Sequence, residues 1–158
     1  HVNKETVEHP HDVWLFGYHR MGEPILHSLK RARNRVAVAD YNPDAIFSLK
    51  KQHVPVYFGD IADIDFLETL KLEKAKLIIS TVPTFDDQLT AIRYIRSINT
   101  KAVIIATLYH KEGKKELEHA GATLVLFPHL LGGEWIAHML KEKKWTKQAL
   151  GALKYINN

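Results

Sequence analysis

The sequence of 158 residues contains no cysteine, so it can form neither disulfide bonds nor thiolate metal sites. It also lacks any apolar run approaching the roughly 20 residues that a membrane-spanning helix needs, and no signal peptide is visible. Its 10 histidines include no pair at helical i, i+4 spacing that makes a convincing zinc set with a carboxylate. We therefore expect no metal site.

Segregated charge is missing as well. The net charge is +4 and the isoelectric point is about 9.2, which by themselves could indicate a nucleic acid or an anionic membrane as partner. However, lysine and arginine are interleaved with aspartate and glutamate nearly everywhere, whereas a binding stripe needs basic residues gathered together. We interpret the charges as an ordinary solvated surface and expect no nucleic-acid partner.

The chain is long enough for one hydrophobic core. With 46% hydrophobic residues, a chain of 158 residues predicts a single globular domain, without a second domain for a substrate. Since the first residue is His1 rather than methionine, we expect that the chain was cut from a longer protein or trimmed of a tag.

The most informative stretch runs from Val13 to Asp40. An apolar run over 13–16 leads into a turn at Gly17, a helical pattern from about Gly22, and a second apolar run that ends at Asp40. This order predicts a strand–helix–strand unit that binds a nucleotide, because a helix N-terminus offers phosphate its free N–H groups and its dipole. Asp40 lies 18 positions after Gly22, where a carboxylate can accept hydrogen bonds from both ribose hydroxyls.

His19 departs from the usual glycine pattern of such a turn. The second glycine of the pattern lets a pyrophosphate approach the backbone, and a side chain obstructs that approach. His19 and its neighbour Tyr18 are therefore either residues of the rim or ligands of the nucleotide. Arg20 stands at the start of the helix, where a cation opposes the helix dipole unless an anion is bound, and this favours a phosphate contact.

Strands and helices alternate along the rest of the chain. Further strands are expected over 54–58, 77–80, 102–106 and 124–127. Helices are expected after the caps Asn42 and Asp63, from Asp86 and Asp87, and over 112–120 with Gly121 as the stop. The pattern predicts an α/β fold, a Rossmann-like doubly wound parallel sheet of six strands in a three-layer αβα arrangement.

Ligands of such sheets bind at the carboxyl ends of the strands, where Gly17, Asp40, Asp60, Thr81 and Thr107 fall. Asp60 could accept a hydrogen bond from an adenine amino group there, or could belong to a simple surface turn.

Catalytic motifs are absent. No tyrosine is followed four residues later by lysine, and there is neither a Gly-x-Ser-x-Gly turn nor a Walker phosphate loop. We therefore expect a protein that binds a nucleotide and is not an enzyme. The alternative is a small NAD-dependent oxidoreductase, or a methyltransferase that uses the same cleft for S-adenosylmethionine.

Five motifs together resemble one family: Gly17-x-His19-Arg20-x-Gly22, Asp40-Tyr41-Asn42-Pro43, Tyr57-Phe58-Gly59-Asp60-Ile61-Ala62-Asp63, Ile79-Ser80-Thr81-Val82-Pro83, and Gly121-Ala122 before Pro128. Over about residues 12–140 the chain is similar to the TrkA-N domain, also called the KTN domain or RCK N-lobe, and most to its antiporter branch. The resemblance implies a homodimeric Rossmann domain on the cytoplasmic face of the cell membrane. Such domains regulate potassium channels, Trk and Ktr transporters and Kef-type cation/proton antiporters, with the membrane part fused or separate.

The resemblance also implies a cofactor, namely AMP, ADP, ATP or NAD(H). Carried over, Gly17, Arg20 and Gly22 would hold phosphate and Asp40 the ribose. Asp60 and the Ile61 backbone would hold adenine, with Thr81 and Val82 on the ribose side. The full set of candidate cofactor-binding residues is Gly17, Tyr18, His19, Arg20, Met21, Gly22, Asp40, Tyr41, Asp60, Ile61, Thr81, Val82 and Thr107.

Two residues depart from the family pattern. His19 replaces the second glycine, and Thr107 stands where many relatives carry an arginine that helps to bind phosphate. Both changes argue against a tightly held pyrophosphate. We expect a mononucleotide such as AMP to bind better than NAD, or the site to have lost much of its affinity.

The chain after Pro128 is rich in apolar residues beyond the finished sheet: Trp135, Ile136, Met139, Leu140, Trp145, Leu150, Leu153, Tyr155 and Ile156. The favoured interpretation is a crossover helix that docks on a second copy of the chain. A helix packed on its own domain, or a basic run over 141–144 beside the membrane, are the alternatives. We divide the chain into a leader or linker (1–11), a nucleotide-binding domain (12–140) and a helical dimerisation or linker segment (141–158).

Overall fold

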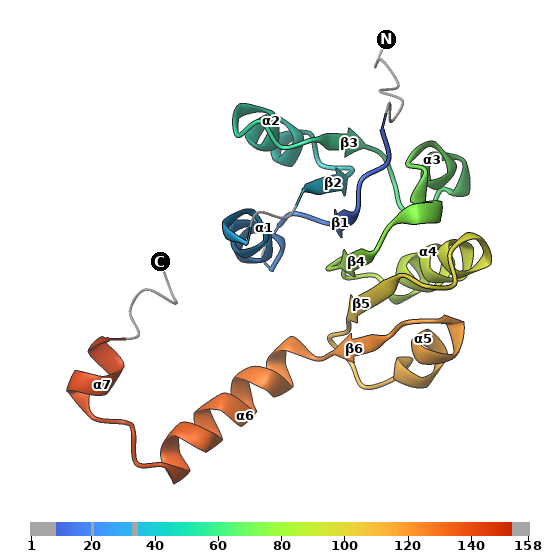
Figure 1. The fold of residues 1–158 in the computed structure, drawn as a ribbon. Coiled ribbons are helices and arrows are strands. Elements are labelled where there is room, and N and C mark those ends of the chain that lie inside the picture. The colour runs from blue at the N-terminus through green and yellow to red at the C-terminus, as the bar shows by residue number, and fades with distance from the viewer. Residues whose placement is uncertain (1–8, 20, 33–34, 153–158) are drawn as a thin grey trace. The chain divides into compact units, whose positions relative to one another are not determined.

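The computed structural model describes residues 9–19, 21–32 and 35–152 (Figure 1). Contacts between Cα atoms divide the chain into two compact units, His1–Leu126 and Phe127–Asn158, which we describe separately. The division falls at the end of the last strand, whereas the expected domain boundary lies at residue 140. This division by contacts does not define the nucleotide-binding domain, whose extent over residues 12–140 stays a prediction.

The first unit is built on a sheet of six strands, and every pair of neighbouring strands is parallel. The strands are β1 (Val13–Phe16), β2 (Val36–Asp40), β3 (Val56–Phe58), β4 (Leu77–Ser80), β5 (Val103–Thr107) and β6 (Leu124–Leu126). Their order across the sheet is β3-β2-β1-β4-β5-β6, the doubly wound order in which the direction of winding reverses between β1 and β4. The predicted six-stranded Rossmann-like sheet is confirmed.

Helices cover both faces of this sheet (Figure 1). One face carries α1 (Gly22–Arg31) and α2 (Pro43–Lys51), and the other carries α3 (Ile64–Thr69), α4 (Phe85–Ile98) and α5 (Lys114–Ala120). A short 3₁₀ turn, η1 (Leu72–Lys74), connects α3 to β4. The arrangement has the three αβα layers that the sequence predicts.

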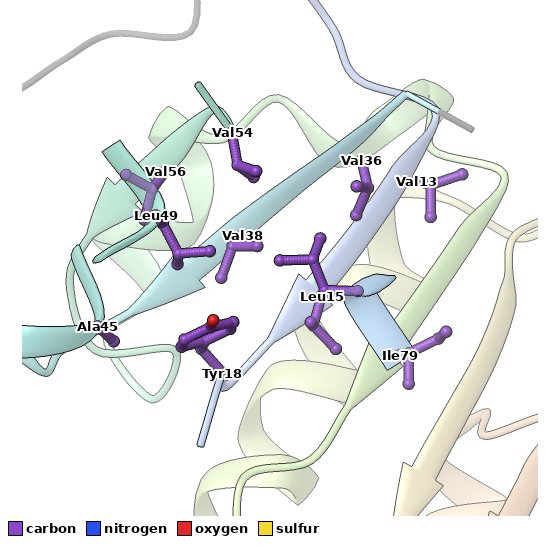
Figure 2. Close-up of a cluster of buried hydrophobic side chains, with 11 residues drawn as sticks. Val13, Leu15, Tyr18, Val36, Val38, Ala45, Leu49, Val54, Val56 and Ile79 are labelled. Atoms are coloured by element: carbon purple, nitrogen blue, oxygen red, sulfur yellow. The ribbon is translucent and has the colours of Figure 1, made fainter. Parts of the chain in front are cut away.

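The apolar core beneath α1 and α2 is shown in Figure 2. It consists of Val13, Leu15, Tyr18, Leu26, Val36, Val38, Ala45, Leu49, Val54, Val56 and Ile79. Leu15 in β1 lies opposite Val38 of β2 and Ile79 of β4, so one row of side chains crosses the centre of the sheet. Because both faces of the central strands are buried, their sequences are continuously apolar rather than alternating.

The helix starts follow the expected caps. The Asn42 side chain accepts a hydrogen bond from the backbone N–H of Asp44 at 2.9 Å, and Asp63 does the same for Asp65 at 3.0 Å. The helix expected over 112–120 begins only at residue 114, because Gly113 has a left-handed φ of +90°. Among the strands, β3 starts two residues later than expected, β5 is shifted by one residue, and β6 ends one residue earlier.

The second unit contains α6 (Pro128–Lys141) and α7 (Lys147–Gly151). No residue of α6 is buried, and Trp135, Ile136 and Leu140 each expose about half of their surface. The expected continuation through Leu153, Tyr155 and Ile156 lies outside the described residues. Among the described residues, no helix combines the length and the apolar character that crossing a bilayer requires.

Candidate functional site

A cleft opens at the carboxyl edge of the sheet. It is lined by Gly17, Tyr18, His19, Ala39, Asp40, Tyr41, Asn42, Gly59, Asp60, Ile61, Thr81, Val82, Pro83 and Asp87. These residues follow β1, β2, β3 and β4 or belong to the first turn of α4. The cleft therefore lies where the winding of the sheet reverses, the usual ligand position of this fold.

The turn after β1 depends on Gly17. Its φ is +87°, a left-handed conformation that glycine adopts without strain, and its N–H donates to the Ala39 carbonyl at 3.0 Å. The Thr81 hydroxyl lies 3.0 Å from the Gly17 carbonyl oxygen, to which it can donate, and a Cβ on Gly17 would lie only 2.8 Å from the same hydroxyl. The loop after β4 thus supports the turn from the other side of the cleft.

Gly22 is the first residue of α1 and is buried. A Cβ at this position would lie 2.3 Å from the carbonyl oxygen of Gly17, so only glycine lets the helix start so close to the turn. The N–H of Gly22 donates to the His19 carbonyl at 3.2 Å. Gly22 therefore positions the helix N-terminus and does not itself line the cleft.

Asp40 has two roles in the site. Its buried carboxylate accepts from the Tyr18 N–H through Oδ2 and from the Asn42 N–H through Oδ1, each at 2.8 Å. It thereby fixes the turn after β1 to the turn after β2. Since an ionised carboxylate offers about four acceptor positions, its two oxygens retain capacity for hydroxyl donors of a ligand.

The described part of the glycine turn has few free backbone donors. The N–H groups of Gly17, Tyr18 and Gly22 are already donated, to Ala39, Asp40 and His19 respectively. The His19 side chain is exposed and lines the cleft at the place where the usual turn has a glycine. Arg20, the candidate phosphate ligand, lies outside the described residues, and its role stays a prediction.

Two carboxylates from separate elements also line the cleft. Asp60 is exposed and its Oδ1 accepts from the Ala62 N–H at 2.9 Å, while Ile61 beside it is buried. Asp87, in the first turn of α4, also lines the cleft. Partial burial and the neighbouring carboxylates of Asp60 and Asp86 raise the pKa of Asp87 above its usual value.

The structure brings ten of the thirteen candidate residues to the cleft: Gly17, Tyr18, His19, Asp40, Tyr41, Asp60, Ile61, Thr81 and Val82 line it, and Gly22 shapes it from behind. Tyr18 is at the same time a core residue, and its hydroxyl accepts from the Gln52 side chain at 3.4 Å. Its exposure is only 8%, so its side chain mainly supports the fold.

Thr107 does not reach the lining, although it ends β5 at the same edge of the sheet. Its hydroxyl lies 3.3 Å from the Ser80 carbonyl oxygen, to which it can donate, and its own carbonyl accepts from the Gln88 side chain. The hydroxyl thus pairs with β4 and the backbone carbonyl with α4, and the residue is only 1% exposed. Met21 is likewise absent from the lining.

Sequence reasoning assigned Asp87 to the start of a helix and missed its place in the cleft. The local sequence predicts that Asp87 lies in the first turn of a helix. It does not predict how that helix packs on the sheet, and the packing decides which residues line the cleft. No signal in the sequence separates Asp87 from Asp86, which does not line the cleft. Among the described residues, no group of three or more histidine, aspartate or glutamate side chains could hold a metal ion.

Comparison with known families decides the identity of the domain, since the model of the TrkA-N domain matches residues 13–128. The chain belongs to the TrkA-N domain family. The match covers the sheet, its helices and every residue of the cleft.

Two relatives illustrate where this TrkA-N domain stands. It is 28% identical over 122 residues to a probable potassium channel protein 2 of Methanocaldococcus jannaschii, covering 75% of this chain and 36% of that protein. It is 25% identical over 114 residues to a putative K⁺ efflux antiporter KefB of Alkalimonas amylolytica, covering 72% of this chain and 17% of the antiporter. The chain thus spans about a third or less of the length of these relatives.

Solved structures share the fold. The TrkA-N domain of the inner membrane protein ybaL from Escherichia coli superposes with a TM-score of 0.75 at 23% identity, over 86% of this chain and 98% of that domain. The Kef C-terminal domain of Shewanella denitrificans in its AMP-bound form has a TM-score of 0.70 at 18% identity, over 92% of this chain and 89% of that domain. The GsuK channel bound to NAD has a TM-score of 0.67 at 22% identity, over 75% of this chain and 22% of the channel chain.

Proposed function

We propose that this TrkA-N domain binds an adenine nucleotide in the cleft and thereby regulates a potassium channel or a monovalent cation/proton antiporter. The observation that carries the proposal is the arrangement of the Gly17 turn, the start of α1 and the Asp40 carboxylate around one cleft. A relative with this fold is known in an AMP-bound form, and relatives in sequence are potassium channel and antiporter proteins.

The residues of the cleft suit the three parts of such a ligand. The N-terminus of α1 is suited to a phosphate group because the helix dipole favours negative charge there, although the N–H groups of Gly17, Tyr18 and Gly22 are already donated within the protein. Asp40 retains acceptor capacity for ribose hydroxyls. Asp60 and the buried Ile61 bound the end of the cleft where the base would lie.

A mononucleotide fits this cleft better than a dinucleotide. Three N–H groups of the glycine turn are already donated, and the His19 side chain occupies the approach that a pyrophosphate would use. No residue of β5 or β6 lines the cleft, and Thr107 is committed to the packing of α4. The second half of NAD would therefore find few contacts, which supports AMP as the preferred ligand.

Regulation requires that the ligand distinguishes two states of an assembly. The exposed apolar residues of α6, including Trp135, Ile136 and Leu140, are suited to docking a second copy of the chain. Nucleotide binding would favour one arrangement of such a homodimer at the cytoplasmic face of the membrane. A difference of about 1–3 kcal/mol in binding free energy would change the transport equilibrium about 5- to 150-fold.

Isothermal titration calorimetry of the whole chain with AMP, ADP, ATP, NAD, NADH and S-adenosylmethionine tests the proposal. We expect saturable binding of AMP, weaker binding of NAD, and loss of binding in Asp40→Ala but not in the matched control Asp44→Ala, which removes an exposed carboxylate of α2. Because Asp40 also anchors two turns, NMR shifts of Gly17, Ile61 and Val82 in the wild type should locate the ligand independently. Absence of any adenine nucleotide binding would contradict the proposal.

A further inference from the structure

Two carboxylates, Asp60 and Asp87, line the same cleft. They come from separate elements: Asp60 follows β3, and Asp87 belongs to the first turn of α4. Their charges interact, since Asp60 contributes to the raised pKa of Asp87. The fold therefore brings two like charges together at a place where water is partly excluded.

The carboxylate of Asp87 lacks a donor. Among the described residues it takes part in no hydrogen bond and no ion pair, although the residue is half-buried. Asp60 uses one oxygen for the Ala62 N–H, which leaves Oδ2 without a partner in the described part of the chain. A half-buried acceptor such as Asp87 is unfavourable without a donor, and a ligand that brings N–H groups would relieve this cost and could also use the free oxygen of the exposed Asp60.

The base of an adenine nucleotide carries two such N–H groups on one atom. Its exocyclic amino nitrogen has two hydrogens that point to opposite sides, so two carboxylates can accept one each. A purine with a carbonyl at the same position presents an acceptor oxygen instead, which both carboxylates repel. Sites that pair a polar group of the correct ligand reject the analogue that lacks it, because their own groups are then left unpaired.

We propose that Asp60 and Asp87 form a double acceptor for the exocyclic amino group of adenine, so that the cleft selects 6-aminopurine over 6-oxopurine nucleotides. This inference rests on the proposed function and adds Asp87 as a residue that determines specificity for the base. Asp86 precedes it on the same helix turn and does not line the cleft, which makes it a natural control.

Titration of the whole chain with AMP, IMP, N6-methyl-AMP and N6,N6-dimethyl-AMP in EDTA tests the inference. We expect affinity to fall about tenfold for each N–H lost, because a hydrogen bond to a charged acceptor is removed at each step. IMP is expected to bind no better than the dimethyl compound. Equal affinities for AMP and IMP would overturn the inference while leaving nucleotide binding intact.

The variant Asp87→Asn separates the two carboxylates. Its amide can donate to the carbonyl of IMP, so we expect the AMP-to-IMP affinity ratio to fall about tenfold or more. Asp86→Asn makes the same change in charge and is expected to leave the ratio unaltered, with thermal denaturation confirming that both variants fold. An unchanged ratio in Asp87→Asn, or the same change in both variants, would overturn the role of Asp87. If AMP does not bind at all, the proposed function fails and this inference fails with it.

Discussion

Substituting Gly22 by alanine tests a close contact between the start of α1 and the backbone of the Gly17 turn. The added Cβ would lie 2.3 Å from the Gly17 carbonyl oxygen, and real Cβ atoms essentially never approach another atom closer than 3.0 Å. The turn and α1 would have to separate by at least about 0.7 Å. The contacting atom is backbone and is part of the turn that Asp40 and Thr81 also hold, so no flexible side chain can absorb the movement.

The expected cost follows from two opposing terms. Gly→Ala inside a helix usually stabilises by about 1 kcal/mol, whereas overpacking a buried contact costs about 1–3 kcal/mol. Because the contacting atom is backbone, we expect the cost to lie at the upper end and Gly22→Ala to lower the free energy of unfolding by up to about 2 kcal/mol, and to weaken AMP binding because the helix N-terminus is displaced. Urea denaturation followed by circular dichroism, together with calorimetry, measures both effects.

The same substitution at Gly132 provides the control. An added Cβ there meets no atom within 4 Å, and Gly132 lies inside α6. Gly132→Ala is therefore expected to be neutral or to stabilise by up to about 1 kcal/mol, without effect on nucleotide binding. Wild-type stability and wild-type affinity in Gly22→Ala would refute the reasoning, because they would mean that the turn and the helix can separate freely.

Three further predictions concern pH and assembly. Burial, partly offset by the charge of Asp12, lowers the pKa of His11. The folded state should therefore lose stability as the pH falls below 6.5 through that lowered pKa, and His11→Phe should flatten this part of a curve of Tm against pH. Because the pKa of Asp87 is raised, the folded state loses stability as the pH rises from 3.8 through that pKa. Asp87→Asn should therefore have a higher Tm than the wild type at pH 7 and the same Tm below pH 3.8. Trp135→Glu combined with Ile136→Glu should convert a dimer into a monomer in light scattering at micromolar concentration, and a monomeric wild type would contradict the dimer.

The alternation of strands and helices could be predicted because its signals are local. The central strands read as continuous apolar runs, and the caps Asn42 and Asp63 act within two residues of their own position. Boundaries were less accurate where backbone conformation decides them. Gly113 adopts a left-handed φ that delays α5 by two residues, and nothing in the flanking sequence requires it.

The site could be predicted only in part. Gly17 and Asp40 come from neighbouring parallel strands, whose carboxyl ends must meet at one edge of the sheet, so their encounter follows from the motif. Thr107 occupies an equivalent position on β5, but its buried hydroxyl lies at the Ser80 carbonyl of the neighbouring β4 and does not line the cleft. Whether a strand-end side chain faces the ligand or the neighbouring helix is a property of packing.

The αβα fold, the glycine turn and the carboxylate that ends β2 could be predicted, since they depend on hydrophobic periodicity, turn residues and spacing along the chain. In contrast, the hydrogen bonds by which Asp40 joins two turns, and the place of Asp87 rather than Asp86 in the cleft, depend on how the elements pack. In the strand order 3-2-1-4-5-6, β2 and β1 separate β3 from β4, yet residues that follow β3 and residues in the first turn of α4 line one cleft, so positions far apart in sequence meet only in the folded sheet.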